Sequence, residues 1–155
     1  MLNDLVEELT RKKKTISTME SCTGGALASE ITNVEGASDV FKFSAITYSN
    51  LFKIKMGVSK DVIDKYSVYS METACEMSRN ISKFTNSNYG VGITGKFGNA
   101  DKENLYGDNY TVFISIYDKD NNKFYNDTAK AFKQNRKENK MLIIKKVNDM
   151  LLKII

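Results

Sequence analysis

The segment Ile16-Ser17-Thr18-Met19-Glu20-Ser21-Cys22-Thr23-Gly24-Gly25 joins an alternating apolar and polar run to a turn of small residues. A strand, a turn and a following helix are typical of open α/β sheets, in which ligands collect at the carboxyl ends of the strands. The helix N-terminus offers N–H groups and a positive dipole end to a phosphate or an oxyanion, and paired glycines allow close approach. A plain turn in which Thr23 caps the helix explains the same residues equally well.

Hydrophobic periodicity and capping residues predict the other elements. The first expected element is a helix with apolar positions Leu2, Leu5, Val6 and Leu9 that ends in the basic cluster Arg11–Lys14. In chain order there follow a strand Thr15–Glu20, a helix after Thr23, a strand Val40–Tyr48, a helix Asn50–Met56, helices capped by Ser59 and Ser70, a strand Tyr89–Thr94, a polar loop Phe97–Gly107, a hairpin of Tyr110–Tyr117 and Lys123–Phe132, and a last helix from Asn135. This order predicts helices on both faces of a mixed sheet, parallel where helices intervene and antiparallel at the hairpin.

Length and composition limit the class of protein. The 155 residues fit one domain, 1–155, and 41% hydrophobic with 27% charged residues is usual for a soluble globular chain. No apolar stretch reaches the roughly 20 residues that span a bilayer, and the acidic N-terminus is unlike a signal peptide, so we expect a cytoplasmic protein. With no histidine and two cysteines, we expect reduced thiols, no metal site and no cofactor.

The net charge of +4 raises the question of an anionic partner. The basic residues fall in Arg11–Lys14 and along Lys130–Lys146, where apolar residues interrupt them at helical spacing, which favours solvated helix faces. A modest positive field also suits a phosphorylated small substrate. A nucleic-acid partner is not expected, because no concentrated basic patch carries interleaved aromatic residues.

A serine, a tyrosine and a lysine are candidates for nucleophilic catalysis. Ser38 follows a small-residue turn, and Tyr48 and Lys53 follow the next strand. A hydroxyl and an amine suffice without histidine, if burial or a neighbouring cation lowers the pKa of the lysine. Each of the three also has an ordinary structural interpretation, and their spacing does not show that they meet. Cys22 has no histidine to generate its thiolate, so a buried structural thiol is favoured.

Two further stretches can line a site at the same sheet edge. Thr94-Gly95 ends a predicted buried strand, and its loop reaches that edge if the strand runs parallel to the first. Arg136, at the start of the last helix, has the forked geometry that binds carboxylate or phosphate, although a surface arginine is the simpler interpretation.

Together these residues resemble the CinA C-terminal domain family, whose enzymatic members are nicotinamide-nucleotide amidohydrolases. The resemblance rests on Glu20–Gly25, Gly36–Ser38, Thr47–Asn50, Lys53 and Arg136. It implies a three-layer α/β/α sandwich with a mixed, mostly parallel sheet. It also implies hydrolysis of nicotinamide mononucleotide to nicotinic acid mononucleotide and ammonia.

The resemblance further implies that Ser38 is the nucleophile, with Tyr48 and Lys53 as its proton-handling partners. We therefore expect Ser38 Oγ within about 2.6–3.2 Å of Tyr48 or Lys53, and the substrate phosphate near the helix start at Thr23–Gly25 or near Arg136. The expected partners are a small phosphorylated nucleotide and further copies of the chain, in a homodimer or higher oligomer, with no membrane. The expected substrate-binding residues are Ser21, Thr23, Gly24, Gly25, Thr94, Gly95 and Arg136.

The chain departs from the family pattern after its third predicted strand. Family members usually read Thr-Gly-Ile-Ala-Gly-Pro where this chain has Thr94-Gly95-Lys96-Phe97-Gly98-Asn99. An alternative hypothesis is therefore a nucleotide-binding or regulatory module of the same fold with weak or no turnover. A third, a competence factor associated with DNA, depends only on the family name and the net charge.

Overall fold

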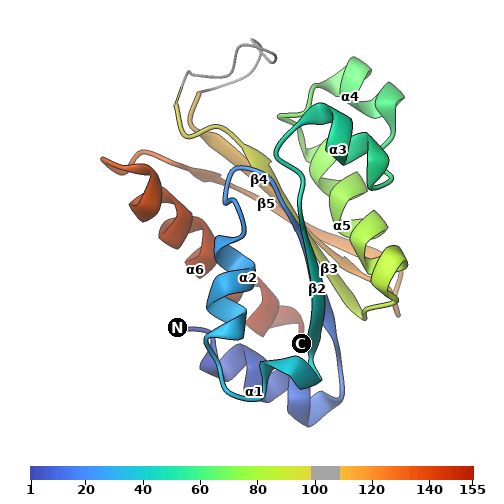
Figure 1. The fold of residues 1–155 in the computed structure, drawn as a ribbon, viewed down its shortest axis with the longest axis vertical. Coiled ribbons are helices and arrows are strands. Elements are labelled where there is room, and N and C mark those ends of the chain that lie inside the picture. The colour runs from blue at the N-terminus through green and yellow to red at the C-terminus, as the bar shows by residue number, and fades with distance from the viewer. Residues whose placement is uncertain (99–108) are drawn as a thin grey trace.

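The computed structural model describes residues 1–98 and 109–155. The elements in chain order are α1 (Asn3–Lys12), β1 (Ile16–Glu20), α2 (Ala26–Thr32), the 3-10 turn η1 (Ala37–Asp39), β2 (Phe41–Ile46), α3 (Asn50–Lys55), α4 (Lys60–Tyr66), α5 (Met71–Thr85), β3 (Tyr89–Gly95), β4 (Thr111–Asp118), β5 (Lys123–Lys130) and α6 (Arg136–Ile154). Figure 1 shows their arrangement around one central sheet. The predicted polar loop falls largely on residues 99–108, outside the described part.

Within the described residues, five strands form one sheet in the order β2-β1-β3-β4-β5. The first three neighbours, β2, β1 and β3, are parallel. The β4 strand runs antiparallel to both β3 and β5. The predicted mixed sheet is confirmed, because helices separate the parallel strands in the chain and a tight turn joins the last two.

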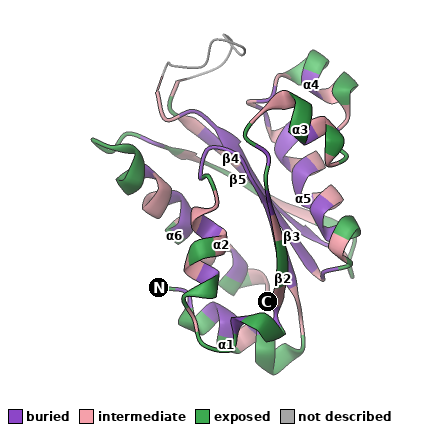
Figure 2. Cartoon of the chain, in the orientation of Figure 1, coloured by how far each residue is buried: buried purple, intermediate pink, exposed green. Residues whose placement is uncertain are grey.

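Helices cover both faces of the sheet, which confirms the three-layer α/β/α prediction. One face carries α1, α2 and α6, and the other carries α3, α4 and α5 (Figure 1). The larger apolar core lies under the first group and includes Leu5, Leu27 and Ile144. The smaller one lies under the second group and includes Met19, Val58 and Met77. In Figure 2 the buried residues follow the central strands and the helix faces that pack on them.

Two glycines in β3 let α5 pack directly on the strand backbone. A Cβ atom on Gly90 would lie 2.0 Å from the Ser78 carbonyl oxygen, and one on Gly92 would lie 2.4 Å from the Ala74 carbonyl oxygen. Any larger residue would force the helix away. The close packing of α5 against Gly90 and Gly92 therefore fixes the position of β3 relative to this helix.

The two predicted serine caps, Ser59 and Ser70, are confirmed, and Asn135 caps the last helix in the same way. The side chains of Ser59, Ser70 and Asn135 each accept a hydrogen bond from the backbone N–H three residues on, at the starts of α4, α5 and α6. None of the helices in the described ranges is both long and apolar enough to cross a membrane.

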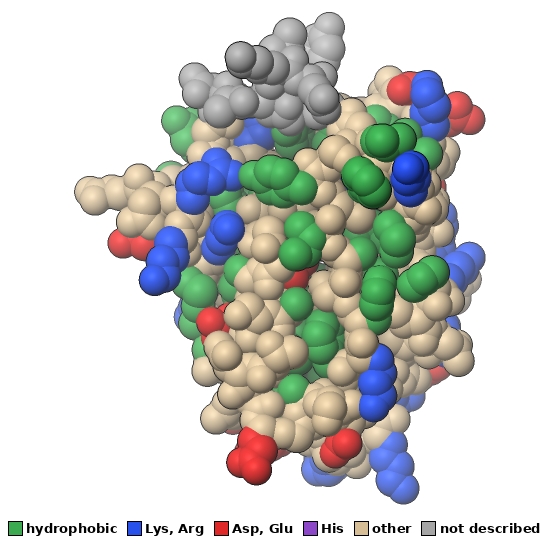
Figure 3. Space-filling view, viewed as in Figure 1, with side chains coloured by type: hydrophobic (Ala, Val, Ile, Leu, Met, Phe, Trp, Pro, Cys, Tyr) green, Lys and Arg blue, Asp and Glu red, His purple; other side chains and the backbone are tan. Residues whose placement is uncertain are grey.

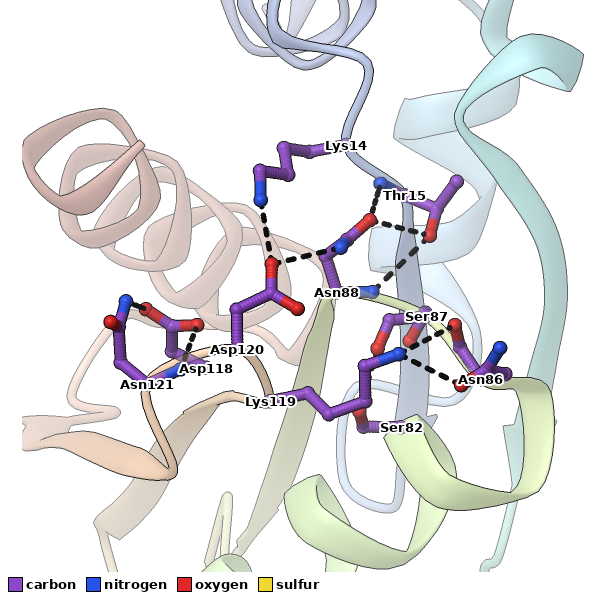
Figure 4. A network of polar contacts seen from close by, with 10 residues as sticks. All are labelled: Lys14, Thr15, Ser82, Asn86, Ser87, Asn88, Asp118, Lys119, Asp120 and Asn121. Carbon is purple, nitrogen blue, oxygen red and sulfur yellow. Dashed lines mark hydrogen bonds and ion pairs between the residues drawn. The ribbon is translucent and has the colours of Figure 1, made fainter.

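A polar network closes the amino ends of the parallel strands (Figure 4). Asn88 Oδ1 accepts hydrogen bonds from Thr15 N and Oγ1, at 2.8 and 3.1 Å, and Asn88 Nδ2 donates to Asp120 at 3.0 Å. Asp120 also forms an ion pair with Lys14 at 2.6 Å. The network joins the start of β1, the start of β3 and the β4–β5 turn.

Candidate active site

A cleft of about 540 Å³ lies at the carboxyl edge of the parallel strands. In Figure 1 this edge of the sheet is toward the top. The cleft is bounded by the segments that follow β1, β2 and β3 and by the start of α6. The lining residues are Ser21, Cys22, Tyr48, Ser49, Asn50, Lys53, Val68, Tyr69, Gly95, Lys96, Phe97, Gly98 and Arg136. This is the sheet edge at which the sequence predicts a site.

A buried lysine and a serine form a pair inside this cleft. Lys53 lies one turn into α3, and its side chain is only 1% exposed. Its Nζ donates to the Thr47 carbonyl at 2.7 Å and lies 2.9 Å from Ser21 Oγ. The Ser21 N–H donates to the Ile93 carbonyl at 3.0 Å, which fixes the serine at the end of β1. A serine hydroxyl beside an amine can act as an activated nucleophile.

The predicted contact of Ser38 with Tyr48 or Lys53 is wrong. Ser38 lies in η1, which precedes β2, and it is exposed. Lys53 and Tyr48 follow the same strand, so all six residues of β2 separate Ser38 from them. At about 3.3 Å per residue the two ends are about 20 Å apart. Ser38 is therefore at the amino edge of the sheet and outside the cleft.

The predicted phosphate site at the start of α2 is occupied by the chain itself. The Glu20 carboxylate is fully buried and accepts hydrogen bonds from Thr23 Oγ1 at 2.7 Å and from the N–H groups of Leu27 and Ala28 at 2.9 and 3.0 Å. Thr23 consequently does not cap the helix, whose N-cap is Gly25. The expected binding of phosphate at Thr23–Gly25 is wrong, because a carboxylate already uses the positive end of the helix.

Gly24 and Gly25 shape the turn and do not line the cleft. Both have left-handed backbone angles, with φ of 59° and 91°. A Cβ atom on Gly25 would lie 2.8 Å from Ile46 Cδ1, so the turn packs tightly against the end of β2. Their left-handed conformations turn the chain so that the first N–H groups of α2 face the Glu20 carboxylate.

Tyr48 and Arg136 meet at the rim of the cleft. Tyr48 is 63% exposed, and its hydroxyl accepts a hydrogen bond from Arg136 Nη2 at 3.2 Å. The Arg136 guanidinium also lies over the Phe97 ring, 5.3 Å from the ring centroid. The tyrosine hydroxyl thus pairs with Arg136 rather than with Ser38. Arg136 remains a predicted phosphate-binding residue, now with a defined position in the cleft.

Thr94 and Gly95, the two residues predicted to bind substrate at the end of β3, have different environments. Gly95 lines the cleft. Thr94 is buried, and its hydroxyl donates to the Val68 carbonyl at 2.8 Å, so it braces the segment before α5.

Sequence reasoning did not assign a site role to Lys96, which lines the cleft with its ammonium 4.7 Å from the Tyr69 ring centroid. Its position directly after a strand that ends at the carboxyl edge is the signal that could have identified it.

Cys22 lines the cleft as a neutral thiol. Burial raises its pKa to about 12, although the positive charge of Lys53 acts in the opposite direction. A thiol with this pKa is a poor nucleophile at neutral pH. Ser21 is therefore the stronger nucleophile candidate in the cleft.

No group of three or more His, Cys, Asp or Glu side chains in the described residues could hold a metal ion.

The fold and the cleft define an α/β protein that pairs a serine with a buried lysine at the carboxyl edge of its sheet. The chain belongs to the CinA C-terminal domain family, whose model matches residues 1–155.

Similar proteins carry the same family name. A CinA-like protein of Flavobacterium psychrophilum is 43% identical over 109 residues, which cover 70% of this chain and 26% of that protein. A CinA-like protein of Kosmotoga olearia is 48% identical over 99 residues, covering 63% of this chain and 24% of its own length. The chain thus spans about a quarter of the curated relatives it matches.

A solved CinA superfamily protein from Escherichia coli has the same fold. The TM-score is 0.87 at 23% identity, with 99% of this chain and 87% of the other covered. At this identity the likeness shows the fold alone.

Proposed function

We propose that the chain is a serine amidohydrolase in which Ser21 is the nucleophile and Lys53 is the base. The observation that carries the proposal is the 2.9 Å separation of Lys53 Nζ and Ser21 Oγ inside the cleft. Burial disfavours the charged form of a lysine, and the neutral amine is the form that accepts a proton. In the structure Lys53 Nζ donates to Ser21 Oγ and to the Thr47 carbonyl. In the neutral form of Lys53, the lone pair of the same nitrogen can accept the proton of the serine hydroxyl.

The reaction proceeds in two balanced stages. Ser21 Oγ attacks the amide carbon while its proton passes to Lys53 Nζ, and the resulting tetrahedral adduct collapses as Lys53 returns that proton to the leaving nitrogen. Ammonia departs and an acyl ester of Ser21 remains. Water then attacks the ester, Lys53 accepts a proton from the water, and the carboxylic acid is released as Ser21 recovers its hydrogen.

The proposed substrate is nicotinamide mononucleotide, which would yield nicotinic acid mononucleotide and ammonia. Membership of the family and the cationic lining of the cleft support this choice, since Arg136 suits a phosphate. In this proposal Tyr48 is a positioning residue rather than a proton carrier, because its hydroxyl holds the Arg136 guanidinium.

Ammonia release from nicotinamide mononucleotide by the purified chain tests the proposal. We expect wild type and Ser38→Ala to release ammonia at similar rates, and Ser21→Ala to retain less than about one thousandth of the activity. Full activity in Ser21→Ala would reject Ser21 as the nucleophile. Binding of the nucleotide without ammonia release would instead support the regulatory-module hypothesis.

Nucleic acid is a weaker candidate as the ligand. On the face that Figure 3 shows, Lys and Arg side chains are scattered rather than gathered in one patch. A duplex backbone is bound by several cations along one surface, whereas Lys53, Lys96 and Arg136 line a cleft of small-molecule size.

A further inference from the structure

The described residues that line the cleft include basic side chains and no acidic ones. Lys53, Lys96 and Arg136 are basic, and none of the described lining residues is Asp or Glu. Lys53 is engaged with Ser21 and the Thr47 carbonyl. Lys96 and Arg136 therefore face the remaining space as cations, with no carboxylate among the described lining residues.

Lys96 is the more unusual of these two. Its side chain is buried, with 5% exposure, and its ammonium has the face of the Tyr69 ring as partner, 4.7 Å from the centroid. Its backbone N–H donates to the Thr111 carbonyl at 3.3 Å, so the main chain at this position is held against β4. Burying a charge is costly unless the charge is paired, and an aromatic face compensates only part of that cost.

Arg136 differs because it is exposed and already has a polar partner. Its guanidinium is held by the Tyr48 hydroxyl and the Phe97 ring. The planar fork can bind two oxygens of one anion, whereas a lysine acts as a point charge. The two residues can thus contribute differently to one anionic group.

We propose that Lys96 binds the phosphate of the substrate together with Arg136, and that it sets the preference of the cleft for a phosphate monoester over a singly charged or neutral ligand. A phosphate monoester carries a charge of about −1.5 to −2 near neutral pH, which two cations match and one does not. This inference rests on the proposed function for the identity of the complete substrate, but the phosphate contact itself does not require hydrolysis.

Calorimetric titration of ribose 5-phosphate into the full chain tests the inference. This probe has a phosphate monoester and no amide, so its binding is independent of turnover. We expect Lys96→Met, which keeps most of the length of the side chain without its charge, to weaken binding by at least about tenfold. The matched control is Lys145→Met, which removes an exposed lysine of α6 outside the cleft and is expected to change affinity less than about twofold.

Two further ligands define the selectivity. Ribose, which lacks the phosphate, and ribonate, which carries one carboxylate, should both bind more weakly than ribose 5-phosphate to wild type. The difference between the phosphate and the carboxylate ligand should shrink in Lys96→Met. Equal affinity of wild type and Lys96→Met for ribose 5-phosphate, or no binding of this probe by wild type, would overturn the inference.

Thermal unfolding separates a binding role from a structural one. Lys96→Met removes a buried charge, so its Tm should equal or exceed that of wild type while its affinity falls. A fall in Tm with unchanged affinity would instead make Lys96 a structural brace for Tyr69. Lys96→Gln serves as a second neutral variant if the methionine variant does not fold. Ser21→Ala separates this inference from the proposed reaction. The variant should lose ammonia release from nicotinamide mononucleotide but bind ribose 5-phosphate like wild type. The phosphate contact can therefore be confirmed even if the proposed reaction is not.

Discussion

The two edges of the sheet are both rich in polar side chains, but they differ in how their charges are paired. At the amino edge, Lys14 pairs with Asp120, and Asn88 connects that carboxylate to Thr15 (Figure 4). At the carboxyl edge, Lys96 and Arg136 line a cleft to which no carboxylate contributes among the described residues.

The carboxyl edge does have a carboxylate, but it points away from the cleft. Glu20 is fully buried and turns toward the first N–H groups of α2. Charges that are paired with carboxylates within the chain contribute to stability. Lys96 and Arg136 instead have aromatic or hydroxyl partners and no carboxylate among the described lining residues of the cleft, so they can also bind an anionic ligand. Substitutions at the amino edge and at the internally bonded Glu20 should therefore affect stability, whereas substitutions of the side chains that line the cleft should affect activity or binding.

The largest effect is expected for Lys53→Met. Loss of the amine removes the proton acceptor of Ser21, which should lower kcat/KM for ammonia release by about 10²–10⁴-fold. Combined with Ser21→Ala, it should add little, because both residues act on one step. Lys55→Met, on the exposed side of the same helix, is the control and should retain activity. Comparable loss in both variants would contradict the special role of Lys53.

Glu20→Gln should come next and should affect stability. The amide would place a hydrogen-bond donor opposite the N–H groups that the carboxylate now satisfies, at a cost of about 1–3 kcal/mol. Chemical denaturation measures this cost. Glu35→Gln, at an exposed position, should change the free energy of unfolding by less than about 0.5 kcal/mol. Equal stability of the two variants would show that the Glu20 carboxylate does not hold the start of α2.

Asn88→Ala tests the amino edge. The change removes the acceptor of two hydrogen bonds from Thr15 and the donor to Asp120, and we expect a loss of about 1–2 kcal/mol in the free energy of unfolding. The kcat/KM of the folded variant should stay within about twofold of wild type. A selective loss of activity with unchanged stability would contradict the division between the edges.

The smallest effect is a pH dependence at Asp120. Its hydrogen bonds with Lys14 and then with Asn88 lower the pKa of this carboxyl below its usual value. A lowered folded-state pKa gives stability that is present above the unfolded value, near 3.9, and is lost as the pH falls through the folded value. The pair is partly exposed, so wild type should exceed Asp120→Asn by only about 0.2–1 kcal/mol at pH 6. This difference should shrink as the pH falls below about 3.9 and through the lowered pKa of Asp120. A difference that grows on acidification would reject the pairing.

The sequence predicts the fold well because local signals agree. Periodicity gives the helices and strands, and the capping serines give two helix starts. The choice of serine failed for a simple physical reason. Ser21 and Ser38 both lie in small-residue turns, but Ser21 follows a strand and Ser38 precedes one, which places them at opposite edges of a parallel sheet.

Other features of the site could not come from the sequence alone. The contact of the Glu20 carboxylate with the start of α2 depends on two glycines with left-handed backbone angles. The sequence pattern does not distinguish this arrangement from a helix that is capped by Thr23. The burial of Lys53 depends on tertiary contacts, with Ser21 after β1 and with the Thr47 carbonyl after β2. Periodicity instead favours an exposed lysine on so short a helix.

The central claim is that Ser21 is the activated nucleophile, and covalent labelling tests it most directly. A fluorophosphonate transfers its phosphonyl group to an activated serine oxygen with loss of fluoride, and peptide mass spectrometry locates the adduct. We predict an adduct on Ser21 that is strongly reduced in Lys53→Met and unchanged in Lys55→Met. An adduct on Ser38 or Cys22, or labelling of Ser21 that persists without Lys53, would contradict the account.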